Sequence, residues 1–366
     1  MTTEATTEAT VDVTPGPDRR GPVRCAIVIV NYNGAALVAG AVESALAQTA
    51  RRDDPARFPV VVVDNASTDG SRAVLSGFGD RVVLIASPRN TGFAGGNNLA
   101  FSRFPEADAY ALLNPDAVAD PEWLAQLLAC ASRHTDWGVI AARIRNAAAP
   151  ELIDNVGHRM ALDGTVRGRG RGERDQGQYA EERSLMVASG CAMLLNGPAV
   201  RQASGFDERF FCYCDDVELC LRLNLAGYTG WFAPAARVAH HFSASAGSAF
   251  SPFKAYHVER NRYWVIAKCF PWPAVPLALG ASVARYLWSA VAAARGRGPG
   301  ARLATDAGAT ALVGALLRAH RDALFGLPEA LRQRRADRSR RTLSMAGFVR
   351  RWRRDYLPLR IAVTLE

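Results

Sequence analysis

Acidic residues at two separate places are the part of this sequence best suited to chemistry. Asp215 and Asp216 stand side by side in the run Asp-Asp-Val-Glu-Leu, and Asp116 closes the apolar run Ala-Leu-Leu-Asn-Pro-Asp at 111–116. A carboxylate placed where a buried strand reaches the surface can hold a divalent ion against a diphosphate. A second carboxylate, close in space, can take a proton from an attacking hydroxyl. Such chemistry requires a fold that brings the two places together.

The first half of the chain predicts a fold of that kind. Strands are expected at 25–30, 60–63, 82–86 and 110–113, with a helix over 35–48 after the first of them. Continuous apolar strands that alternate with helices are typical of an α/β fold with a mostly parallel sheet covered on both faces. Ligands of such sheets bind beyond the carboxyl ends of the strands. An α/β scaffold with both acidic places favours an enzyme that transfers a sugar from a nucleotide-activated donor.

Each expected strand ends in polar residues or glycine, and each such cluster also has a purely structural interpretation. Asp64 and Asn65 could open a turn and cap the next helix. The segment 92–98 could be a loop that needs positive φ, or its glycines could let backbone N–H groups approach an anion at a helix start. Residues 114–116 could be a turn, and Asp215 could be a helix N-cap. Polar clusters at four strand ends favour binding over four unrelated turns.

The middle of the chain changes character. Residues 146–184 are polar and rich in Gly and Arg, which predicts either a mobile flap that excludes water from a site or a surface insertion. A strand is expected over 185–195, and an amphipathic helix runs from the acidic pair through Arg222 and Leu225. The run at 92–96 does not match Gly-x-Gly-x-x-Gly, which argues against a nicotinamide-dependent enzyme.

Composition and cysteine usage limit the class of protein. At 366 residues and 49% hydrophobic content, the chain can bury one large core and carry appendages. Residues 1–22 are predicted to be a disordered tail without the apolar run of a secretion signal. Seven irregularly spaced cysteines indicate reduced thiols in a cytoplasmic protein. The expected units after the tail are a catalytic domain over 23–250, an amphipathic helical extension over 251–300 and an arginine-rich helical segment over 301–366.

The net charge of +9 comes from the arginine-rich segment. Twelve arginines and three acids lie between Arg318 and Arg354, so the rest of the chain nets to zero. Apolar residues interleave with these arginines, as in a helix that lies on an anionic membrane face. Nucleic-acid binding and a solvated helix packed on the core are the alternatives. Residues 270–294 are apolar but contain three prolines and Arg285, which predicts an interrupted segment rather than a membrane-spanning helix.

Taken together, the motifs resemble the family 2 glycosyltransferases and, within them, the rhamnosyltransferase-like branch. The resemblance covers roughly residues 24–265 and rests on six ordered motifs. These are Val-Asn-Tyr-Asn-Gly (30–34), Val-Val-Asp-Asn-Ala-Ser-Thr-Asp-Gly-Ser (62–71), Asn-Thr-Gly-Phe-Ala-Gly-Gly-Asn-Asn (90–98), Leu-Asn-Pro-Asp (113–116), Ser-Gly-Cys-Ala-Met-Leu (189–194) and Gly-Phe-Asp-Glu-Arg-Phe-Phe with Asp-Asp-Val-Glu-Leu-Cys-Leu-Arg (205–222).

The resemblance implies a GT-A fold, inversion at the anomeric carbon and a nucleoside-diphosphate sugar, dTDP- or UDP-linked, as the donor. It also implies Mg²⁺ or Mn²⁺ as cofactor, a deoxysugar such as L-rhamnose, and a glycan or lipid-linked acceptor of the cell envelope. Nucleic acid is not an expected partner. The expected location is the cytoplasm, with peripheral attachment to the inner face of the cell membrane. A catalytically silent GT-A domain, acting as a membrane-attached scaffold that binds nucleotide sugars, is the alternative that scattered carboxylates would favour.

Carried over position by position, the resemblance assigns a role to each site residue. Asp216 is assigned as the general base, with Asp215 as the second catalytic acid. The nucleotide-sugar pocket is assigned to Tyr32, Asn33, Asp64, Asn90, Gly95, Gly96, Asn97 and Asn114, the metal to Asp116 and His240, and the acceptor side to Gly190 and Cys191. This sequence departs from the family at two positions. Asn114 replaces the first acid of Asp-x-Asp, and Asp215 replaces the Glu of the Glu-Asp pair.

Overall fold

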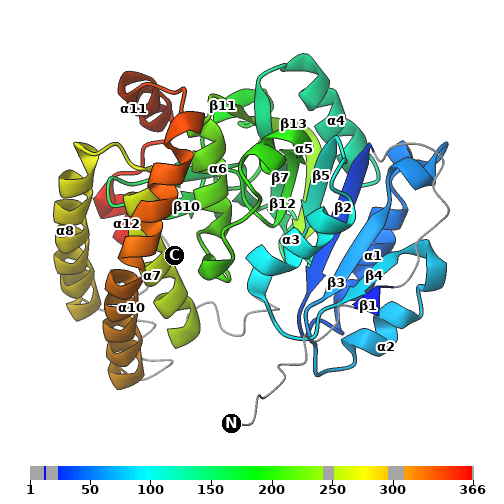
Figure 1. Ribbon diagram of the computed structural model, residues 1–366, viewed down its shortest axis with the longest axis horizontal. Helices are drawn as coiled ribbons and strands as arrows, with labels where there is room; N and C mark the ends of the chain where they lie inside the picture. Colours follow the sequence, from blue (N-terminus) through cyan, green and yellow to red (C-terminus); the bar gives the residue numbers. More distant parts are fainter. Residues whose placement is uncertain (1–11, 14–23, 242–250, 296–308, 365–366) are drawn as a thin grey trace, which may run out of the picture.

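The computed structural model describes residues 12–13, 24–241, 251–295 and 309–364 (Figure 1). The tail predicted for residues 1–22 therefore lies outside the described residues, except for Asp12–Val13. These two residues form strand β1 and pair with β4.

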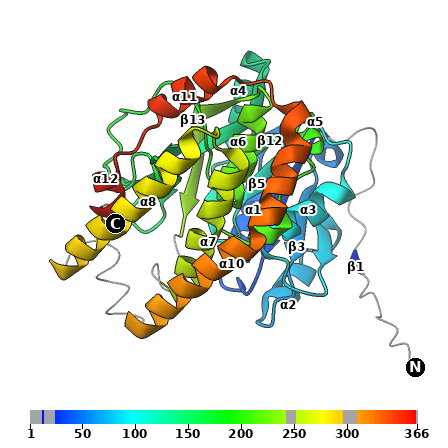
Figure 2. The ribbon, with the colours of Figure 1, turned by 60° about the vertical axis from the view of Figure 1, so that its left-hand side comes forward.

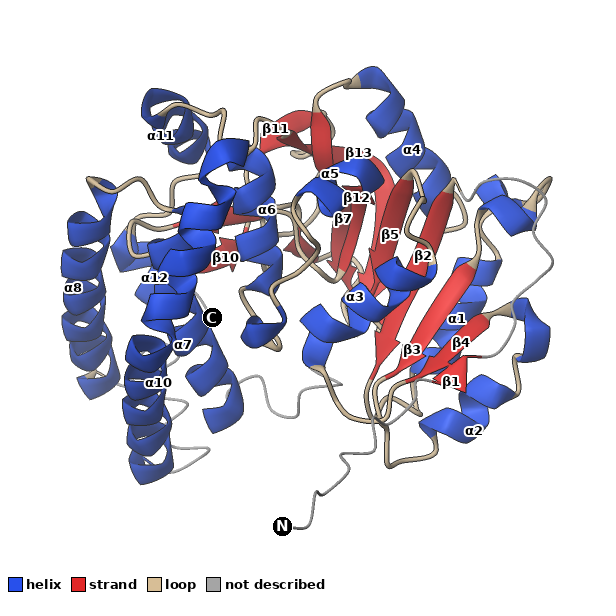
Figure 3. Cartoon of the chain, in the orientation of Figure 1, coloured by secondary structure: helices blue, strands red, loops and turns tan. Residues whose placement is uncertain are grey.

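One mixed sheet forms the centre of the described part of the chain (Figure 3). Its strand order is β1-β4-β3-β2-β5-β12-β7-β13-β11, with β6 paired to β13 and β8 to β7. The strands are β2 Cys25–Asn31, β3 Val60–Asp64, β4 Val83–Ala86, β5 Ala109–Leu113, β6 Ala117–Ala119, β7 Trp137–Asn146, β8 Ile153–Asn155, β11 Arg183–Leu185, β12 Ala192–Asn196 and β13 Thr229–His240, and the separate hairpin is β9 His158–Met160 with β10 Val166–Gly168.

The parallel α/β arrangement predicted for the first half is confirmed. Strands β4, β3, β2 and β5 are parallel neighbours, whereas β12 runs antiparallel between β5 and β7. Alternate side chains of β2 enter opposite cores: Ile27 and Ile29 pack with one layer of helices, and Val28 packs with the other. Because both faces are covered, these strands read as continuous apolar runs.

Helices cover both faces of the sheet, and a helical group extends it on one side (Figures 1 and 2). The helices are α1 Val38–Leu46, α2 Ser71–Ser76, α3 Gly92–Arg103, α4 Trp123–Arg133, α5 Gly197–Gln202, α6 Asp215–Leu225, α7 Pro252–Cys269, α8 Ala274–Ala294, α10 Ala309–Ala336, α11 Met345–Arg354 and α12 Leu359–Thr364. Short 3₁₀ turns occur at Thr49–Arg51, Pro55–Arg57, Gly79–Arg81, Glu208–Phe210 (η4) and Asp337–Arg340 (η5).

Three local expectations differ from the structure. For the glycine-rich segment at 92–98 the loop alternative is wrong, because these residues form the start of α3, with Gly92 alone at positive φ (+71°). Gly96 allows close packing of this helix on the sheet, since a side chain there would lie 2.5 Å from Val30. No single strand spans 185–195, since the backbone leaves the sheet between β11 and β12. The apolar segment is less interrupted than expected: Pro271 and Pro273 lie between α7 and α8, and Pro276 lies in the first turn of α8, where proline is tolerated, so residues 274–294 form one helix.

Several arginines of the C-terminal segment bind the core rather than facing solvent. Arg334 of α10 is buried and donates hydrogen bonds to the carbonyls of Ala267 (2.9 Å) and Phe270 (2.6 Å), at the end of α7. Arg351 of α11 donates to the side chain of Asn224 (2.9 Å) in α6. Basic side chains at a helix C-terminus satisfy carbonyls that have no partner within the helix. At Arg334 and Arg351, the arginine-rich segment therefore packs on the core, which was one of the alternatives to membrane binding.

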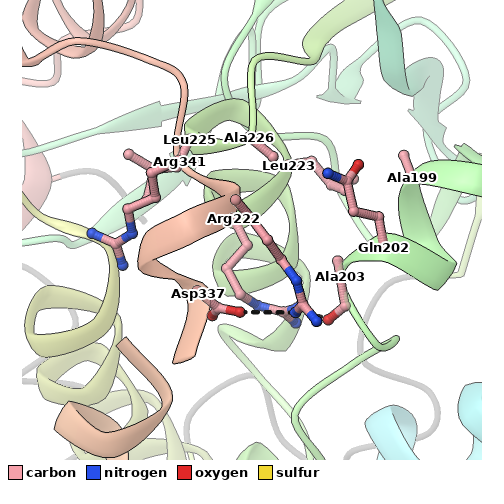
Figure 4. Close-up of a pocket in the computed structure, with 10 residues that line it drawn as sticks. Ala199, Gln202, Ala203, Arg222, Leu223, Leu225, Ala226, Asp337 and Arg341 are labelled. Carbon is pink, nitrogen blue, oxygen red and sulfur yellow. Dashed lines mark hydrogen bonds and ion pairs between the residues drawn. The ribbon is translucent and has the colours of Figure 1, made fainter. Parts of the chain in front are cut away.

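A small pocket marks where this segment meets the core (Figure 4). Its volume is about 20 Å³, and α5, α6 and η5 supply its walls. Within it, Arg340 donates a 3.1 Å hydrogen bond to Asp337. A space of this size holds about one water molecule. It is a small packing defect between the C-terminal segment and the core, and none of the predicted site residues line it.

Replacing Arg334 with Met should lower the free energy of unfolding by about 2 kcal/mol, because buried carbonyls at the end of α7 would lose their donor. The matched control is Arg332→Met, whose side chain is 78% exposed and should change stability by less than about 0.5 kcal/mol. Chemical denaturation of the two variants measures the difference. Equal losses in both would contradict the packed role of Arg334.

Candidate functional site

A cavity of about 750 Å³ opens at the carboxyl ends of the parallel strands. The segment 154–171 and the first turns of α6 and α7 form the rest of its wall. Of the predicted site residues, those that line it are Tyr32, Asn90, Asn114, Gly190, Cys191, Asp215, Asp216 and His240, and those that do not are Asn33, Asp64, Gly95, Gly96, Asn97 and Asp116. The cavity lies within the size range of small-molecule sites.

The ends of β2 and β3 form the part of the site predicted for the nucleotide. Register places Asn31 beside Asp64, so the loops after the two strands run together. The side chain of Asn33, a residue at φ +51°, accepts a 2.8 Å hydrogen bond from the backbone N–H of Thr68. This bond joins the two loops. Tyr32 is 42% exposed at the rim. One wall is therefore preformed by backbone geometry, and an aromatic ring is left free to cover a ligand.

Asp64 and Asn65, at the end of β3, have different roles. Asn65 donates to the side chain of Asn90 (3.0 Å) and accepts from the backbone N–H of Thr91 (2.9 Å), so it fixes the start of α3. Asp64 is buried, and one of its carboxylate oxygens has no hydrogen-bond partner among the described residues. A buried acceptor without a partner is costly unless a ligand supplies the donor.

Gly95, Gly96 and Asn97 were predicted to contact the nucleotide sugar, but in the structure they support the cavity wall instead. Gly95, Gly96 and Asn97 are buried inside α3, and the Asn97 side chain donates to the carbonyl of Phe93 within the same helix (2.8 Å). Their small volume lets α3 lie against β2, which sets the position of Phe93 on the cavity wall. The structure therefore gives these three residues no direct contact with the cavity.

The acidic pair occupies the first turn of α6, and the N-cap is Cys214 rather than Asp215. The Asp216 carboxylate accepts hydrogen bonds from the backbone N–H groups of Gly190 (2.9 Å) and Val217 (2.8 Å). A side chain on Gly190 would lie 3.0 Å from the ring of Phe93 and 3.4 Å from Cβ of Asp216. Because Gly190 has no side chain, its backbone N–H can approach the Asp216 carboxylate. Gly190 is a positioning residue for Asp216.

The two acids have different environments. Asp215 is buried, and one of its oxygens has no partner among the described residues. Burial raises the pKa of Asp215 well above its ordinary value, and the neighbouring charge of Asp216 raises it further. Asp215 therefore favours the protonated form, whereas the Asp216 carboxylate is held by two backbone donors.

A strained turn leads into the acidic pair. Phe211 (φ +64°), Tyr213 (+64°) and Cys214 (+61°) all adopt left-handed backbone conformations, which are costly for residues with side chains. The fully buried amide of Asn261, in α7, donates to three carbonyls between residues 210 and 213 at 2.7–3.0 Å. The sequence interpretation missed Asn261, although a polar residue between two arginines in a helix was a signal that could have found it.

Asp116 and His240 meet because β6 pairs with β13, which places Ala117 opposite His240. The Nε2 atom of His240 lies 3.4 Å from Asp116, and its Nδ1 atom lies 2.8 Å from Asp154. A carboxylate on the far ring nitrogen is the usual support of a metal-binding histidine, because it orients Nε2 towards the ion. A carboxylate and an imidazole at this spacing, with the Asn114 amide on the same wall, fit Mg²⁺ or Mn²⁺.

A proton competes for the same position on His240. Burial lowers the pKa of His240, but Cys191 and the hydrogen bonds to Asp116 and Asp154 outweigh it, and the net shift is upward. An ion at this position therefore displaces a proton from the imidazole. Asp154 was missed by the sequence interpretation, since no motif marked it.

The segment 146–184 is built into the wall rather than detached from it. Arg143 of β7 forms a two-pronged ion pair with Asp175 (2.7 and 2.9 Å), and Arg159 donates to the carbonyl of Tyr356 (2.8 Å). Its cavity-facing side chains include His158, Arg167 and Arg171, none of which had been assigned a role. The repeated Arg-Gly pattern at 166–172 was the available signal for the two arginines.

Comparison with known proteins agrees with this arrangement. Residues 26–201 match the model of the family described as Glycosyl transferase family 2. The N-acetylglucosaminyl-diphospho-decaprenol L-rhamnosyltransferase of Mycobacterium tuberculosis is 28% identical over 240 residues, which cover 60% of this chain and 78% of that protein.

Two solved structures share the fold. A mannosyltransferase from Pyrobaculum calidifontis in complex with GDP-Man and Mn²⁺ aligns with a TM-score of 0.50 at 18% identity, over 87% of this chain and 91% of that one. GalNAc-T7 with UDP, GalNAc and Mn²⁺ aligns with a TM-score of 0.53 at 14% identity, over 68% of this chain and 49% of that one. This chain therefore spans about half the length of GalNAc-T7.

Replacing Asp215 with Asn should stabilise the protein more at high pH than at low pH. The raised pKa means that the folded state binds this proton more tightly than the unfolded state does. The stability that the proton contributes is complete below the unfolded pKa of about 3.9 and is lost as pH rises towards the folded pKa. Thermal unfolding in chelator should show a gain in Tm for Asp215→Asn that grows with pH. Exposed Asp80→Asn is the control, and a pH-independent gain would argue against the protonated assignment.

Proposed function

We propose a function on the premise that this chain belongs to glycosyl transferase family 2 and has the GT-A fold, as its motifs predicted. It is a glycosyltransferase that takes a sugar from a nucleoside-diphosphate donor. We infer further that it is an inverting hexosyltransferase and that the sugar is a deoxysugar such as L-rhamnose. The acceptor we infer is a hydroxyl of a cell-envelope, polysaccharide or lipid-linked precursor.

The observation that carries the proposal is the placement of Asp216. Its carboxylate faces a cavity formed by the ends of the parallel strands, and two backbone N–H groups fix its orientation. In an inverting transfer, the acceptor hydroxyl attacks the anomeric carbon opposite the leaving diphosphate, and its proton must leave late in the attack. A positioned carboxylate accelerates such a step by ~10²–10⁴-fold. Asp215, held neutral beside it, keeps the second charge out of the site.

The strand ends fit the donor. Tyr32 at the rim and the unpartnered oxygen of buried Asp64 support recognition of a pyrimidine base, which presents a ring face and an N–H group. This supports a dTDP- or UDP-linked sugar. The two solved structures of this fold contain UDP and GDP-mannose respectively, so the fold accepts nucleotides with either class of base.

Asp116 and His240 are the residues that would hold Mg²⁺ or Mn²⁺. Their spacing, and the support of His240 by Asp154, fit such an ion, and both solved relatives contain Mn²⁺. When bound, the ion neutralises the charge that grows on the leaving diphosphate. Asn114 supplies a neutral oxygen where the family has an acid, so the site carries one negative charge fewer.

Convergence of the acids weighs against the silent scaffold. Scattered carboxylates would favour a scaffold, but Asp215 and Asp216 line the same cavity as His240, which contacts Asp116. Asp215, Asp216 and His240 therefore border one cavity, and Asp116 lies just behind its wall, 3.4 Å from His240. The relative from Mycobacterium tuberculosis is named for a lipid-linked acceptor, which supports an acceptor of that class here.

We also propose that the protein attaches to an anionic membrane through the outer faces of α8 and α10. Within the described residues, Ala274–Ala292 is the one helical stretch long and apolar enough to cross a membrane by length and composition. Arg285 of the same helix turns inward and pairs with Asp163 (2.6 Å), which holds α8 against the protein. An apolar face on a helix held this way suits the membrane surface.

The surface we define as the α8–α10 face consists of exposed apolar side chains on helices at the same end of the molecule (Figures 1 and 2). Its members are Leu277, Leu279, Val283, Leu287, Trp288 and Val291 on α8 and Val313, Leu317, Leu324 and Phe325 on α10. Exposed Arg318 and Arg321 lie between the apolar residues of α10. The positive charge of Arg318 and Arg321 complements anionic lipid. The α8–α10 face therefore replaces the whole arginine-rich segment as the expected membrane contact.

Asp216→Asn should reduce turnover by ~10²–10⁴-fold while leaving donor binding intact, because the amide cannot accept the acceptor's proton. Release of nucleoside diphosphate from a panel of nucleotide sugars measures turnover, and thermal stabilisation by the same donors measures binding. Asp80→Asn, exposed and remote, is the control. Near-normal turnover by Asp216→Asn would remove it from the role of base, and full activity in excess chelator would remove the metal.

Leu287→Asp combined with Phe325→Asp should release the protein from anionic liposomes. Each change places a negative charge on the α8–α10 face, where it loses apolar burial and meets like charge. Met345→Asp, at an exposed position of α11 outside that face, is the matched control. Co-sedimentation of the wild type should also weaken in high salt, since screening shortens to ~3 Å at 1 M. Equal sedimentation of both variants would exclude this face as the contact.

A further inference from the structure

A basic wall faces the acidic centre of the cavity. Arg167 on β10, Arg171 just after it and Lys254 in the first turn of α7 all line the cavity, and all are half-buried. Arg171 lies 3.8 Å from Asp154, which itself holds His240. A row of polar contacts thus runs from Asp116 through His240 and Asp154 to these cations. None of the three has a role in the proton transfer or metal binding described above.

The three cations are close enough to disturb one another. Burial lowers the pKa of Lys254, and Arg171 and Arg167 lower it further. Burial likewise lowers the pKa of Arg167, followed by the charges of Arg171 and Arg285. Gathering like charges in a partly buried wall costs free energy, and an anion bound among them recovers it.

Ion pairs on the side of the wall away from the cavity fix its position, so the fold itself keeps the three cations together. Buried Asp163, in the β9–β10 turn, pairs with Arg285 (2.6 Å) and lies 3.6 Å from Arg262, and Arg262 also contacts Glu259. The shortest contacts of these carboxylates are therefore with Arg262 and Arg285 rather than with the cavity-facing cations. The guanidinium group of Arg167 donates to the carbonyl of Ala362 in α12 (3.3 Å), which orients this side chain.

The wall is also separated from the nucleotide side. Tyr32, Asn65 and Asn90 line the cavity at the ends of β2–β4, whereas the basic wall comes from β10 and α7. Figure 1 shows β10 and α7 on one side of α6, with β2 and β3 on the other. Asp216 and His240 also line the cavity, and they come from α6 and the end of β13. An anion at the basic wall would therefore belong to a second ligand.

We infer that Arg167, Arg171 and Lys254 form a second anion subsite, which binds a phosphate or diphosphate group of the acceptor. This inference rests on the proposed transfer to a lipid-linked acceptor and names the part of that acceptor which the protein recognises. Arginine and lysine are the side chains best suited to phosphate, by paired hydrogen bonds and point charge respectively. Arg285 of α8 stands behind the wall, so the subsite lies between the reacting centre and the helix that carries the apolar face.

The test titrates inorganic phosphate into the full chain by calorimetry, with Mg²⁺ and saturating UDP present so that the donor site is occupied. The wild type should still bind phosphate, and binding should weaken as salt rises. Arg167→Gln combined with Lys254→Gln should weaken phosphate binding about tenfold or more, as expected when charged donors are lost. UDP affinity should stay within about twofold under the same conditions. Exposed Arg174→Gln, on the same segment, is the matched control and should bind phosphate normally.

Three results would overturn the inference. Loss of phosphate binding on saturation with UDP, or equal weakening of UDP and phosphate in the variant, would assign the wall to the donor diphosphate. Unchanged phosphate binding in the double variant would remove the subsite altogether. Lys254→Gln alone provides the same readout with α12 contacts intact, in case the double variant unfolds. Phosphate binding needs no turnover, so failure of the transferase assay and failure of the subsite remain separate outcomes.

Discussion

The hydrogen bonds from Asn261 to the 210–213 backbone are the constraint on which the site depends. Three left-handed residues in a row of four would not persist in a free loop, since each costs on the order of 1–3 kcal/mol. Asn261 is fully buried in α7, and its amide offers both hydrogens to this turn. Because the turn ends at the first residue of α6, its shape decides where Asp216 projects. A helix outside the α/β sheet thus determines the geometry of the acid pair.

The same dependence on distant segments appears in the electrostatics. The proposed metal ligands Asp116 and His240 meet through β6 and β13, the supporting Asp154 comes from β8, and the basic wall comes from β10 and α7. The acidic centre and the basic wall meet at Arg171, which lies 3.8 Å from Asp154, while Asp163 behind the wall is paired with Arg262 and Arg285. The metal that we propose at His240 and the basic wall would therefore lie side by side, joined through Asp154.

Much of the fold and part of the site could be predicted from sequence, for identifiable reasons. Strands such as 60–63 were predictable because their burial on both faces leaves a continuous apolar run, and strand ends mark ligand sites in α/β folds. Asp215, Asp216 and His240 followed from motifs. Gly95 and Gly96 were misplaced, because close packing of α3 on Val30 and approach to an anion demand the same residue type. Asp154 and Lys254 could not be found, since only the tertiary fold brings them to the cavity.

The contacts of Asp355 bear on how the protein is made. Its side chain accepts the backbone N–H of Met186 (3.1 Å), its carbonyl accepts that of Met160 (2.8 Å), and the Trp352 indole donates to the carbonyl of Met160 (3.1 Å). Residues near 355 therefore secure the hairpin and the strand exit that face the cavity. During synthesis the parallel sheet can form early, since its strands are local and N-terminal. The cavity wall can be completed only after the ribosome has delivered a segment nearly two hundred residues later, so a nascent chain emerges folded in its sheet and open at its catalytic edge.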